Sequence, residues 1–507
     1  MNKKNIENKA LLYSKCEPLI FEKNSPGASG IDIQAPYLKE DRLGGLNRKG
    51  SIGLPELSEP EIVRHYTRVS QMNCSIDTTF YPLGSCTMKY NPRLNEKLAR
   101  LSGLSDIHPF QPESTVQGAY QLIDTLAKWL KTLTGLPAVA LSPAAGAHGE
   151  LCGMMAIKAA HNAKNQNNRN TVLVPDSAHG TNPATASICG YQIETIPSED
   201  NGQINKKALL KRLDSDVAAV MITNPNTCGL FEEAAVSLAA DIHAAGAYFY
   251  MDGANFNAIV GQVTMADLGV DAMHINLHKT FSTPHGGGGP GAGPTVLSEA
   301  LAPFAPVPFL KTNEDGTFKM IEHAGREGAT QSFGRLKGFQ GQFGVYIRAL
   351  SYILSLGIDG LRQVSSDAVL NANYLRVQLS QELTPAYNSM CMHEVLFNDS
   401  FLKNTGITTL DFSKALIDLG YHPPTIYFPL VVSGALLIEP TETESKATLD
   451  KFIEDILALA RKAKNGKSKQ FFKNSPMSAP RRRLDESKAA RHPVLRWHKH
   501  NAKQAAE

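Results

Sequence analysis

The stretch Met273-His-Ile-Asn-Leu-His-Lys-Thr-Phe-Ser-Thr-Pro-His-Gly-Gly-Gly-Gly-Pro-Gly-Ala-Gly-Pro294 decides how the rest of the chain is interpreted. A short apolar run ends in His278, Lys279 and Thr280, and a glycine-rich loop follows. A lysine at the end of a buried strand can place its amine next to a flat cofactor. The glycines of the following loop have no side chains, so they leave room for that cofactor. Burial readily lowers the pKa of a lysine, and the neutral amine is a nucleophile toward an aldehyde. Taken alone, the stretch could equally be a surface lysine beside a flexible linker.

Upstream of this stretch, β-rich runs alternate with helical stretches. The alternation predicts right-handed crossovers and a mainly parallel sheet with helices on both faces, which is an α/β fold. Ligands bind such sheets at the carboxyl ends of the strands, so the residues after each run are the candidates for chemistry. The predicted strands cover residues 171–174, 192–196, 217–222, 247–251 and 272–275, and the predicted helices cover 117–133, 206–213 and 233–245.

The composition changes along the chain and predicts four segments. Residues 1–95 form an N-terminal arm with one helix over Pro60–Met72, because proline is common at a first helical position. Residues 96–335 form a large cofactor-binding α/β domain. Residues 336–465 form a smaller C-terminal α+β domain with helices over 343–356 and 361–383 and short β pieces at 393–397 and 435–438. Residues 466–507 form a basic tail, either solvated or docked on an acidic subunit.

Composition excludes several classes of protein. A formal net charge of +3 over 507 residues does not suggest a nucleic-acid or membrane partner. The seven cysteines contain no C-x-x-C pair, which argues against a structural zinc site and a disulfide framework, so no metal is expected. We find no signal peptide and no apolar stretch long enough to span a bilayer. The prediction is a cytoplasmic protein.

Polar residues follow the predicted strands in turn. The small-residue loop at 141–150 leads into a helix, whose free N–H groups and dipole can bind a phosphate. His179 could stack on a planar ligand or be a structural histidine. Asn224 could donate to a phenolate-type oxygen or belong to a plain Asn-Pro turn. Asp252 could pair with a protonated pyridine nitrogen or cap a helix; Lys279 comes 27 residues later, leaving room for one crossover helix.

Together these residues form the set of groups that pyridoxal 5′-phosphate requires. They supply an anion site, a ring contact, a counter-charge for the ring nitrogen and an amine for the aldehyde. Asp252 would keep the ring nitrogen protonated, which makes the ring a better electron sink. Thr280, next to the lysine, could add a hydroxyl to the phosphate site.

Seven motifs along the chain carry a family resemblance. They are Tyr81-Pro-Leu-Gly-Ser-Cys-Thr-Met-Lys-Tyr90, Ile107-His-Pro-Phe-Gln-Pro-Glu113, Gly146-Ala-His-Gly-Glu150, Thr223-Asn-Pro-Asn-Thr227, His278-Lys-Thr-Phe281, Gly286-Gly-Gly-Gly-Pro-Gly291 and Leu437-Ile-Glu-Pro-Thr-Glu-Thr-Glu-Ser445. These motifs resemble the glycine dehydrogenase (decarboxylating) family, the P proteins of the glycine cleavage system, in the two-chain form whose second subunit is catalytic. The resemblance runs from about residue 17 to the end of the chain. It implies the fold type I architecture of pyridoxal-phosphate enzymes, which is aspartate aminotransferase-like.

The resemblance also implies a reaction and partners. Glycine loses carbon dioxide, and its aminomethyl group passes to the lipoyl arm of the carrier H protein. The implied partners are the first subunit, in an α2β2 heterotetramer, and the lipoylated H protein.

Residue roles follow from the same resemblance. Lys279 would bind the cofactor covalently, Asp252 would face its ring nitrogen and His179 would lie over its ring. His278 would be a nearby acid, base or contact group. The loop at 81–93 and the segment around His108 would line the mouth of the site. Gly146 and Ala147 would cradle the phosphate.

Two other readings stay open from the sequence. The chain could be another enzyme of the same fold, such as an aminotransferase or an amino acid decarboxylase. An aminotransferase usually needs an arginine for the substrate carboxylate, and Arg335, Arg348, Arg362 and Arg376 are available. The chain could also be a non-catalytic scaffold subunit of the same fold. The pair of Lys279 and Asp252 argues against a scaffold.

Overall fold

The structure is a computed structural model that describes residues 17–497, except residues 32, 35–41, 51, 287–290 and 327. Cys16 and most of the Gly286–Gly291 motif lie outside the described residues. The chain divides into two compact units. The larger unit contains Phe80–Ser413 and His422–Lys469, and the smaller contains Met1–Thr79, Lys414–Tyr421 and Gln470–Glu507. The four segments drawn from the sequence stay a prediction.

A seven-stranded sheet forms the centre of the larger unit, in the order β1-β7-β6-β5-β4-β2-β3. The mainly parallel sheet is confirmed: β2 to β6 pair in parallel, and β7 runs antiparallel to both of its neighbours. The two short strands β1 and β7 were not predicted, because three residues are too few to show a period of two. The strands are β1 (Ala138–Ala140), β2 (Thr171–Pro175), β3 (Gln192–Ile196), β4 (Val217–Thr223), β5 (Tyr248–Gly253), β6 (Ala272–Ile275) and β7 (Thr295–Leu297).

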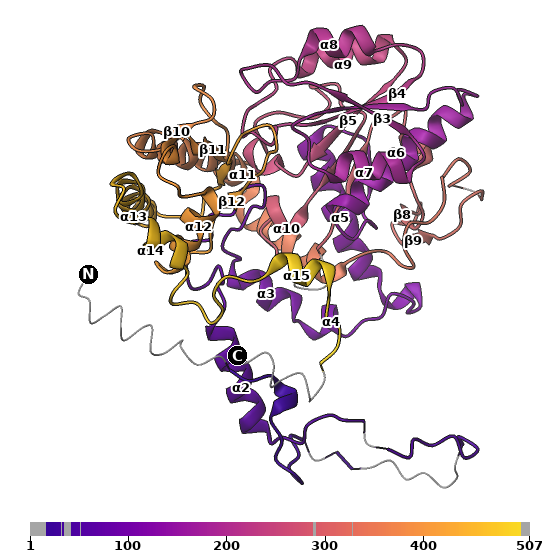
Figure 1. Cartoon of the computed structure of the whole chain (residues 1–507). Coiled ribbons are helices and arrows are strands. Elements are labelled where there is room, and N and C mark those ends of the chain that lie inside the picture. Colours follow the sequence, from indigo (N-terminus) through magenta and orange to yellow (C-terminus); the bar gives the residue numbers. More distant parts are fainter. Residues whose placement is uncertain are drawn as a thin grey trace. The chain divides into compact units, whose positions relative to one another are not determined.

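Helices cover both faces of this sheet (Figure 1). Successive strand residues point to opposite faces, so Phe249 and Met251 pack in one core and Tyr248 and Tyr250 in the other. Burial of both faces accounts for the nearly continuous apolar runs in the sequence. One face is covered by α5 (Gln117–Thr134), α8 (Lys206–Arg212), α9 (Ala235–Ala244) and α11 (Phe343–Leu379), and the other by α6 (Gly146–Ala163) and α7 (Thr181–Ile188).

The connection between β5 and β6 differs from the prediction. Between the two strands the chain forms the 3₁₀ helix η3 (Phe256–Ala258) and a series of turns, and it forms no α-helix there. Asp252 lies inside β5 instead of after it, because the strand runs two residues beyond the predicted end. The two helices predicted at 343–356 and 361–383 form one run, α11, with a kink at Gly357, where φ is +62°.

A second, four-stranded antiparallel sheet lies in the same unit, in the order β10-β11-β13-β12. Both β pieces predicted for this region are present, as β11 and β13. Its strands are β10 (Thr384–Pro385), β11 (Val395–Asn398), β12 (Thr425–Ile426) and β13 (Leu436–Ile438), and the helices near it in the chain are η5 (Asp399–Leu402), α12 (Thr409–Ile417) and α13 (Lys446–Lys464).

Short elements complete the larger unit. The antiparallel pair β8–β9 follows the central sheet in the chain, and α10 carries the lysine of the opening stretch. The bounds are α3 (Arg93–Ala99), α4 (Ser102–Ser105), η2 (Glu113–Thr115), α10 (Leu277–Thr280), η4 (Ala302–Phe304), β8 (Phe309–Thr312) and β9 (Phe318–Ile321).

The smaller unit contains α2, the helix predicted after Pro60. Ser58 and Glu61 cap its first turn reciprocally, and the proline stands in that turn. The carboxylate of Glu17 accepts hydrogen bonds from Arg68, whose guanidinium holds the pKa of Glu17 well below its usual range. The helices of this unit and of the basic C-terminal region are η1 (Ile20–Glu22), α2 (Glu59–Gln71), α14 (Lys469–Asn474) and α15 (Glu486–Arg491).

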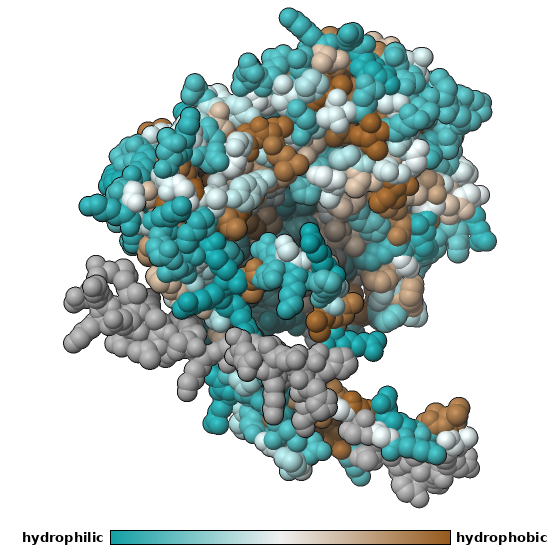
Figure 2. All heavy atoms as spheres, viewed as in Figure 1, coloured by the Kyte–Doolittle hydropathy of each residue, from teal (hydrophilic) through white to brown (hydrophobic). Residues whose placement is uncertain are grey.

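The surface is mixed. On the face drawn in Figure 2, apolar patches alternate with polar surface. None of the helices in the described part of the chain combines the length and the apolar character that a membrane crossing requires. The cysteines that the structure describes are all unpaired.

Candidate active site

A cavity of about 140 Å³ opens at the carboxyl ends of β4, β5 and β6. This is the edge at which ligands bind in open α/β sheets. Five of the residues predicted from the sequence line it: Gly146, Ala147, His179, Asp252 and Lys279. The wall also contains residues that were not singled out, namely Glu150, Thr181, Thr223, Thr227, Ala254, Asn255, His274 and Asn276, together with Ser85 from the loop at 81–93.

Lys279 lies on α10, directly after β6, and its side chain is half-buried. Its Nζ donates a hydrogen bond to the carbonyl oxygen of Ser85, at 2.8 Å. Part of the loop predicted to line the mouth therefore contacts the lysine. His108, the other residue predicted at the mouth, is not among the described residues that line this cavity.

Asp252 is buried in β5, where an unpaired carboxylate would be costly. Asn182 Nδ2 donates to its Oδ2 and the Ala254 N–H donates to its Oδ1, both at 2.9 Å. His274 Nε2 lies 3.4 Å from Oδ1. Burial acts to raise the pKa of Asp252, but the charge of His274 and these hydrogen bonds outweigh it and lower the pKa. Asp252 is therefore held as a carboxylate facing the cavity.

A polar network supports this carboxylate. Asn182 also donates to Glu150 Oε2, at 2.9 Å, and Tyr250 Oη lies 2.7 Å from His274 Nδ1. Burial and the charge of Asp252 raise the pKa of Glu150, so the pKa values of the two neighbouring carboxyl groups shift in opposite directions. Helical spacing could have pointed to Glu150, because it stands four residues after Gly146 on α6.

His179 follows β2 and is exposed at the rim of the cavity. Its Nδ1 accepts a hydrogen bond from the Thr181 backbone N–H, at 3.2 Å, and lies 2.8 Å from the Thr181 hydroxyl. The ring makes a T-shaped contact with Phe428, with 5.6 Å between the ring centroids. These contacts hold the imidazole at the cavity wall.

The first turn of α6 provides the anion side of the cavity. Gly146 and Ala147 begin this 18-residue helix, where free N–H groups and the helix dipole favour an anion. A Cβ on Gly149 would lie 2.6 Å from the Cβ of His274 on β6, so glycine permits the close approach of helix and strand.

Two buried polar atoms on the cavity wall lack partners. Thr223 Oγ1 and Asn276 Oδ1 make no hydrogen bond to any described residue. Buried polar groups in native proteins are normally hydrogen-bonded, so these atoms indicate a bound polar ligand. An amine, an opposed carboxylate, a helix N-terminus and two open hydrogen-bonding atoms in one cavity fit pyridoxal 5′-phosphate.

Three predicted residues are not among those that line the cavity. Asn224 Oδ1 accepts the Glu232 backbone N–H, at 3.0 Å, and its Nδ2 is buried without a described partner. The hydroxyl of Thr280 is also buried and unpartnered. Burial, with the charges of His285 and Lys279, lowers the pKa of His278 to about 3. The roles given to these three residues stay predictions.

The arginines considered for a substrate carboxylate have other contacts. Arg348 Nε donates to Glu96, at 2.7 Å, and Arg335 pairs with Glu322. Arg362 donates to the Gly261 carbonyl oxygen, at 2.9 Å. None of the four, including Arg376, is among the described residues that line the cavity.

Residues 83–91, which we call the strap, run along the second sheet and the segment after it. Leu83 forms an antiparallel bridge with Ile438, and the Thr87 hydroxyl donates to Glu439 Oε1, at 2.5 Å. Glycine is required at position 84, because a Cβ there would overlap Leu437. Two motifs far apart in the sequence, 81–90 and 437–445, therefore pack against each other.

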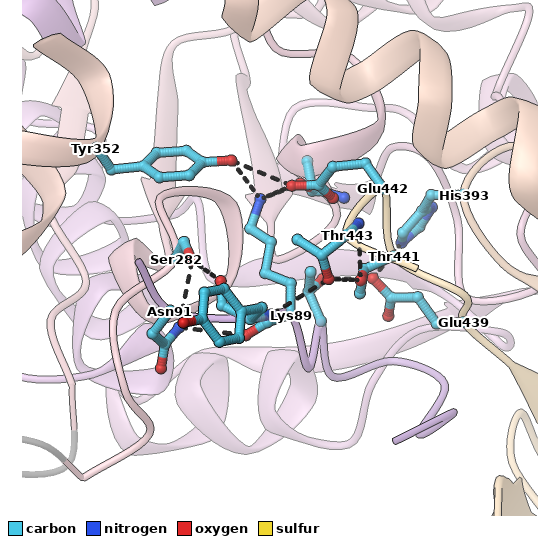
Figure 3. Close-up of polar contacts among 12 residues, drawn as sticks. Lys89, Asn91, Ser282, Tyr352, His393, Glu439, Thr441, Glu442 and Thr443 are labelled. Carbon is cyan, nitrogen blue, oxygen red and sulfur yellow. Dashed lines mark hydrogen bonds and ion pairs between the residues drawn. The ribbon is translucent and has the colours of Figure 1, made fainter. Parts of the chain in front are cut away.

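A buried ion pair fixes the middle of the strap (Figure 3). Lys89 is 3% exposed, and its Nζ donates to Glu442 Oε1, at 2.8 Å, and to Tyr352 Oη, at 3.3 Å. Further along, Asn91 Nδ2 donates to the hydroxyl of Ser282, at 3.2 Å. The strap is thus bound both to the second sheet and to the segment that follows Lys279.

Comparison with known proteins identifies the family. Residues 364–480 match the family described as "Glycine dehydrogenase, C-terminal domain", and residues 152–290 match "Aminotransferase class-V". The chain is 62% identical to "Probable glycine dehydrogenase (decarboxylating) subunit 2" of Caulobacter vibrioides, over 95% of this chain and 92% of that protein. It is 49% identical to the protein of the same name from Kosmotoga olearia, over 94% of this chain and 99% of that protein.

Solved structures confirm the fold. A glycine decarboxylase (P-protein) of the glycine cleavage system, in inhibitor-bound form, superposes with a TM-score of 0.68 at 21% identity, over 84% of this chain and 93% of that one. A glutamate decarboxylase from Lactobacillus brevis superposes with a TM-score of 0.63 at 12% identity, over 85% and 96% of the two chains. The predicted fold type I, aspartate aminotransferase-like architecture is therefore confirmed. At 62% identity over nearly its whole length, the chain belongs to the family of glycine dehydrogenase (decarboxylating) subunit 2.

Proposed function

We propose that this chain is the catalytic, pyridoxal-phosphate-dependent subunit that decarboxylates glycine. It releases carbon dioxide and passes the aminomethyl group to the lipoyl arm of the glycine cleavage H protein. The observation that carries the proposal is the pairing of Lys279 and Asp252 on the wall of one cavity. The family names of its relatives support glycine as the substrate.

The cavity residues divide the task of holding the cofactor. Lys279 would supply the amine for its aldehyde, and Asp252 would pair with its ring nitrogen. Gly146 and Ala147 would offer N–H groups to its phosphate, and His179 would contact the ring. When bound, pyridoxal 5′-phosphate withdraws the electrons that decarboxylation leaves on the glycine carbon.

The surroundings of Asp252 set the charge of this carboxylate before the substrate binds. The charge of His274 and the hydrogen bonds from Asn182 and the Ala254 N–H keep Asp252 ionised, so its charge can hold a proton on a ring nitrogen bound beside it. Burial and the charge of Asp252 raise the pKa of the neighbouring Glu150. Charges that are in place beforehand need no reorganisation during the reaction.

The proposed partners follow from the family. We assign a first subunit in an α2β2 heterotetramer, the lipoylated H protein and glycine, with no role for a nucleic acid or a membrane. The term "subunit 2" in the names of the relatives supports the first subunit. We place the protein in the cytoplasm, and the unpaired state of the described cysteines supports a reducing compartment.

Reduction of the cofactor-bound protein with borohydride tests the proposal directly. We expect the reduced cofactor on the peptide that contains Lys279, because this is the lysine that lines the cavity. Mass mapping of the digested protein gives the position. A label on another lysine would contradict the role of Lys279, and the absence of any label, even with the first subunit added, would favour a scaffold subunit.

Replacing Asp252 with asparagine should lower glycine-dependent carbon dioxide exchange on the order of a hundredfold, the effect typical of removing one preorganised electrostatic group. The amide can keep the hydrogen bond from Ala254 but carries no charge toward the ring nitrogen. The exchange of labelled bicarbonate into glycine measures the change. Asp271→Asn is the matched control, because Asp271 precedes β6 at the opposite end of the sheet; equal losses in the two variants would contradict the role of Asp252.

A further inference from the structure

The backbone of Ser85 joins the cavity lysine to a buried carboxyl group outside the cavity. Its carbonyl oxygen accepts the hydrogen bond from Lys279 Nζ, at 2.8 Å. Its N–H donates to Glu394 Oε2, at 2.7 Å. Glu394 is 0% exposed and is not among the described residues that line the cavity. One residue of the strap therefore links Lys279 to a side chain of the second sheet.

Ser85 adopts a left-handed backbone conformation that requires stabilising contacts from its neighbours. Its φ is +65°, in the left-handed region that residues with a Cβ enter at a cost. Such conformations persist where the surroundings fix them, and they gather at functional sites. Here the fixing contacts are the Glu394 carboxyl on the Ser85 N–H and the Thr425 hydroxyl, which donates to the Gly84 carbonyl oxygen at 2.7 Å.

Glu394 is itself held rigidly. It immediately precedes β11, and the neighbouring Met392 N–H donates to the Gly229 carbonyl oxygen, at 2.7 Å. Gly229 follows β4 and packs so closely on the Glu394 backbone that a Cβ there would overlap it. The backbone around Glu394 is thus held by the loop after β4 as well as by its own place before β11.

We propose that Glu394 is a positioning residue for Lys279. By holding Ser85 in the left-handed turn, it aims the Ser85 carbonyl oxygen at the lysine and provides the acceptor that binds the Lys279 amine whenever this amine is not joined to the cofactor. A lysine that is joined to a cofactor is released from it each time a substrate amine replaces the lysine amine. A hydrogen-bond acceptor in a fixed position then holds the released amine in the same place after every turnover. The inference rests on the proposed function, since it assumes that Lys279 is the cofactor lysine.

The surroundings of Glu394 predict which substitution it tolerates. Burial and the neighbouring charge of Glu439 raise the pKa of Glu394 well above its usual range. The carboxyl oxygen that accepts the Ser85 N–H can be replaced by an amide oxygen, whereas an apolar side chain of the same length cannot accept the bond. Glu394→Gln should therefore preserve the position of Ser85, and Glu394→Met should release it.

The test measures the reactivity of the Lys279 amine in the full-length chain after its cofactor has been removed with hydroxylamine. An N-hydroxysuccinimide acetate labels the lysines, and mass mapping gives the rate at Lys279 relative to the exposed Lys128 in the same sample. We expect Glu394→Met to accelerate labelling of Lys279 about fivefold, the ratio that corresponds to losing one restraining hydrogen bond. We expect Glu394→Gln to remain within about twofold of the wild type.

A matched control separates positioning from a general loss of stability. Asp271 is also buried and accepts a backbone N–H, that of Phe249, at 2.8 Å, but it lies at the far end of β6. Asp271→Leu should leave the labelling of Lys279 unchanged. Equal acceleration in Asp271→Leu and Glu394→Met, or wild-type labelling in a folded Glu394→Met, would overturn the proposal.

Ser85→Pro decides the matter if Glu394→Met does not fold. Proline has no N–H for Glu394 to accept and fixes φ at about −65°, so the carbonyl oxygen must turn away from Lys279 and labelling should accelerate here too. Labelling at the wild-type rate would overturn the proposal. This test can fail independently of the proposed function. Borohydride mapping of the wild type shows whether Lys279 binds the cofactor. Labelling of the cofactor-free chain shows which contacts restrain the Lys279 amine.

Discussion

Replacing Lys279 with alanine should abolish glycine-dependent carbon dioxide exchange, with a loss on the order of a thousandfold or more, as for other groups that form the covalent bond of a reaction. The amine is the group that binds the cofactor aldehyde, and the described residues that line the cavity include no second lysine. The exchange of labelled bicarbonate into glycine, with the H protein and the first subunit present, measures the loss.

The Lys279→Ala chain should keep its fold. The side chain is half-buried, and its Nζ donates a hydrogen bond to an uncharged carbonyl oxygen, so removing the amine leaves that oxygen without a charge to compensate. Circular dichroism and the melting temperature check this expectation. Lys128→Ala, on the exposed side of α5, is the control for a lost lysine and should retain full exchange. Substantial residual exchange in Lys279→Ala would contradict the role given to this lysine.

Replacing Lys89 with methionine should destabilise the larger unit by about 3–5 kcal/mol, the range typical of removing one partner of a buried ion pair. Methionine fills much of the same volume but leaves Glu442 without its cation, in a site where both side chains are nearly inaccessible. The amide oxygen of Asn257 and the hydroxyl of Tyr352 lose the same donor. Urea unfolding, followed by circular dichroism, gives the change in the free energy of unfolding.

The double variant Lys89→Met/Glu442→Gln shows whether the charge left behind causes this loss. Removing both charges should be less destabilising than the sum of the single replacements, because the uncompensated carboxylate is gone. Lys446→Met, which breaks the exposed pair with Asp450 on α13, should change stability little. A loss in Lys89→Met no greater than that in Lys446→Met would contradict the prediction.

Much of the fold could be predicted because the central strands are buried on both faces. The runs at 171–174 and 217–222 are apolar for this reason, and each was placed to within one residue of β2 and β4. The link from β5 to β6 could not be predicted, because its length fits a helix but turns and η3 satisfy the connection. Periodicity carries no information about a segment of that kind.

The sequence predicted those site residues whose own side chains carry a group that the cofactor needs. Lys279, Asp252 and His179 each bear a group that the cofactor needs, and all three line the cavity. Glu150 and His274 were missed because they support Asp252 through contacts that exist only once α6 and β6 pack together. Glu394 was missed for the same reason, since no spacing in the sequence connects it with Ser85.

The packing of the strap has a consequence for protein synthesis. A ribosome completes Lys279 and its acceptor Ser85 long before it reaches Glu394, Glu439 and Glu442, which hold the strap in place. A nascent chain released before residue 394, in the last quarter of the sequence, thus contains Lys279 and Ser85 but lacks the carboxyl groups that contact the strap. These contacts can form only after translation has passed Glu442.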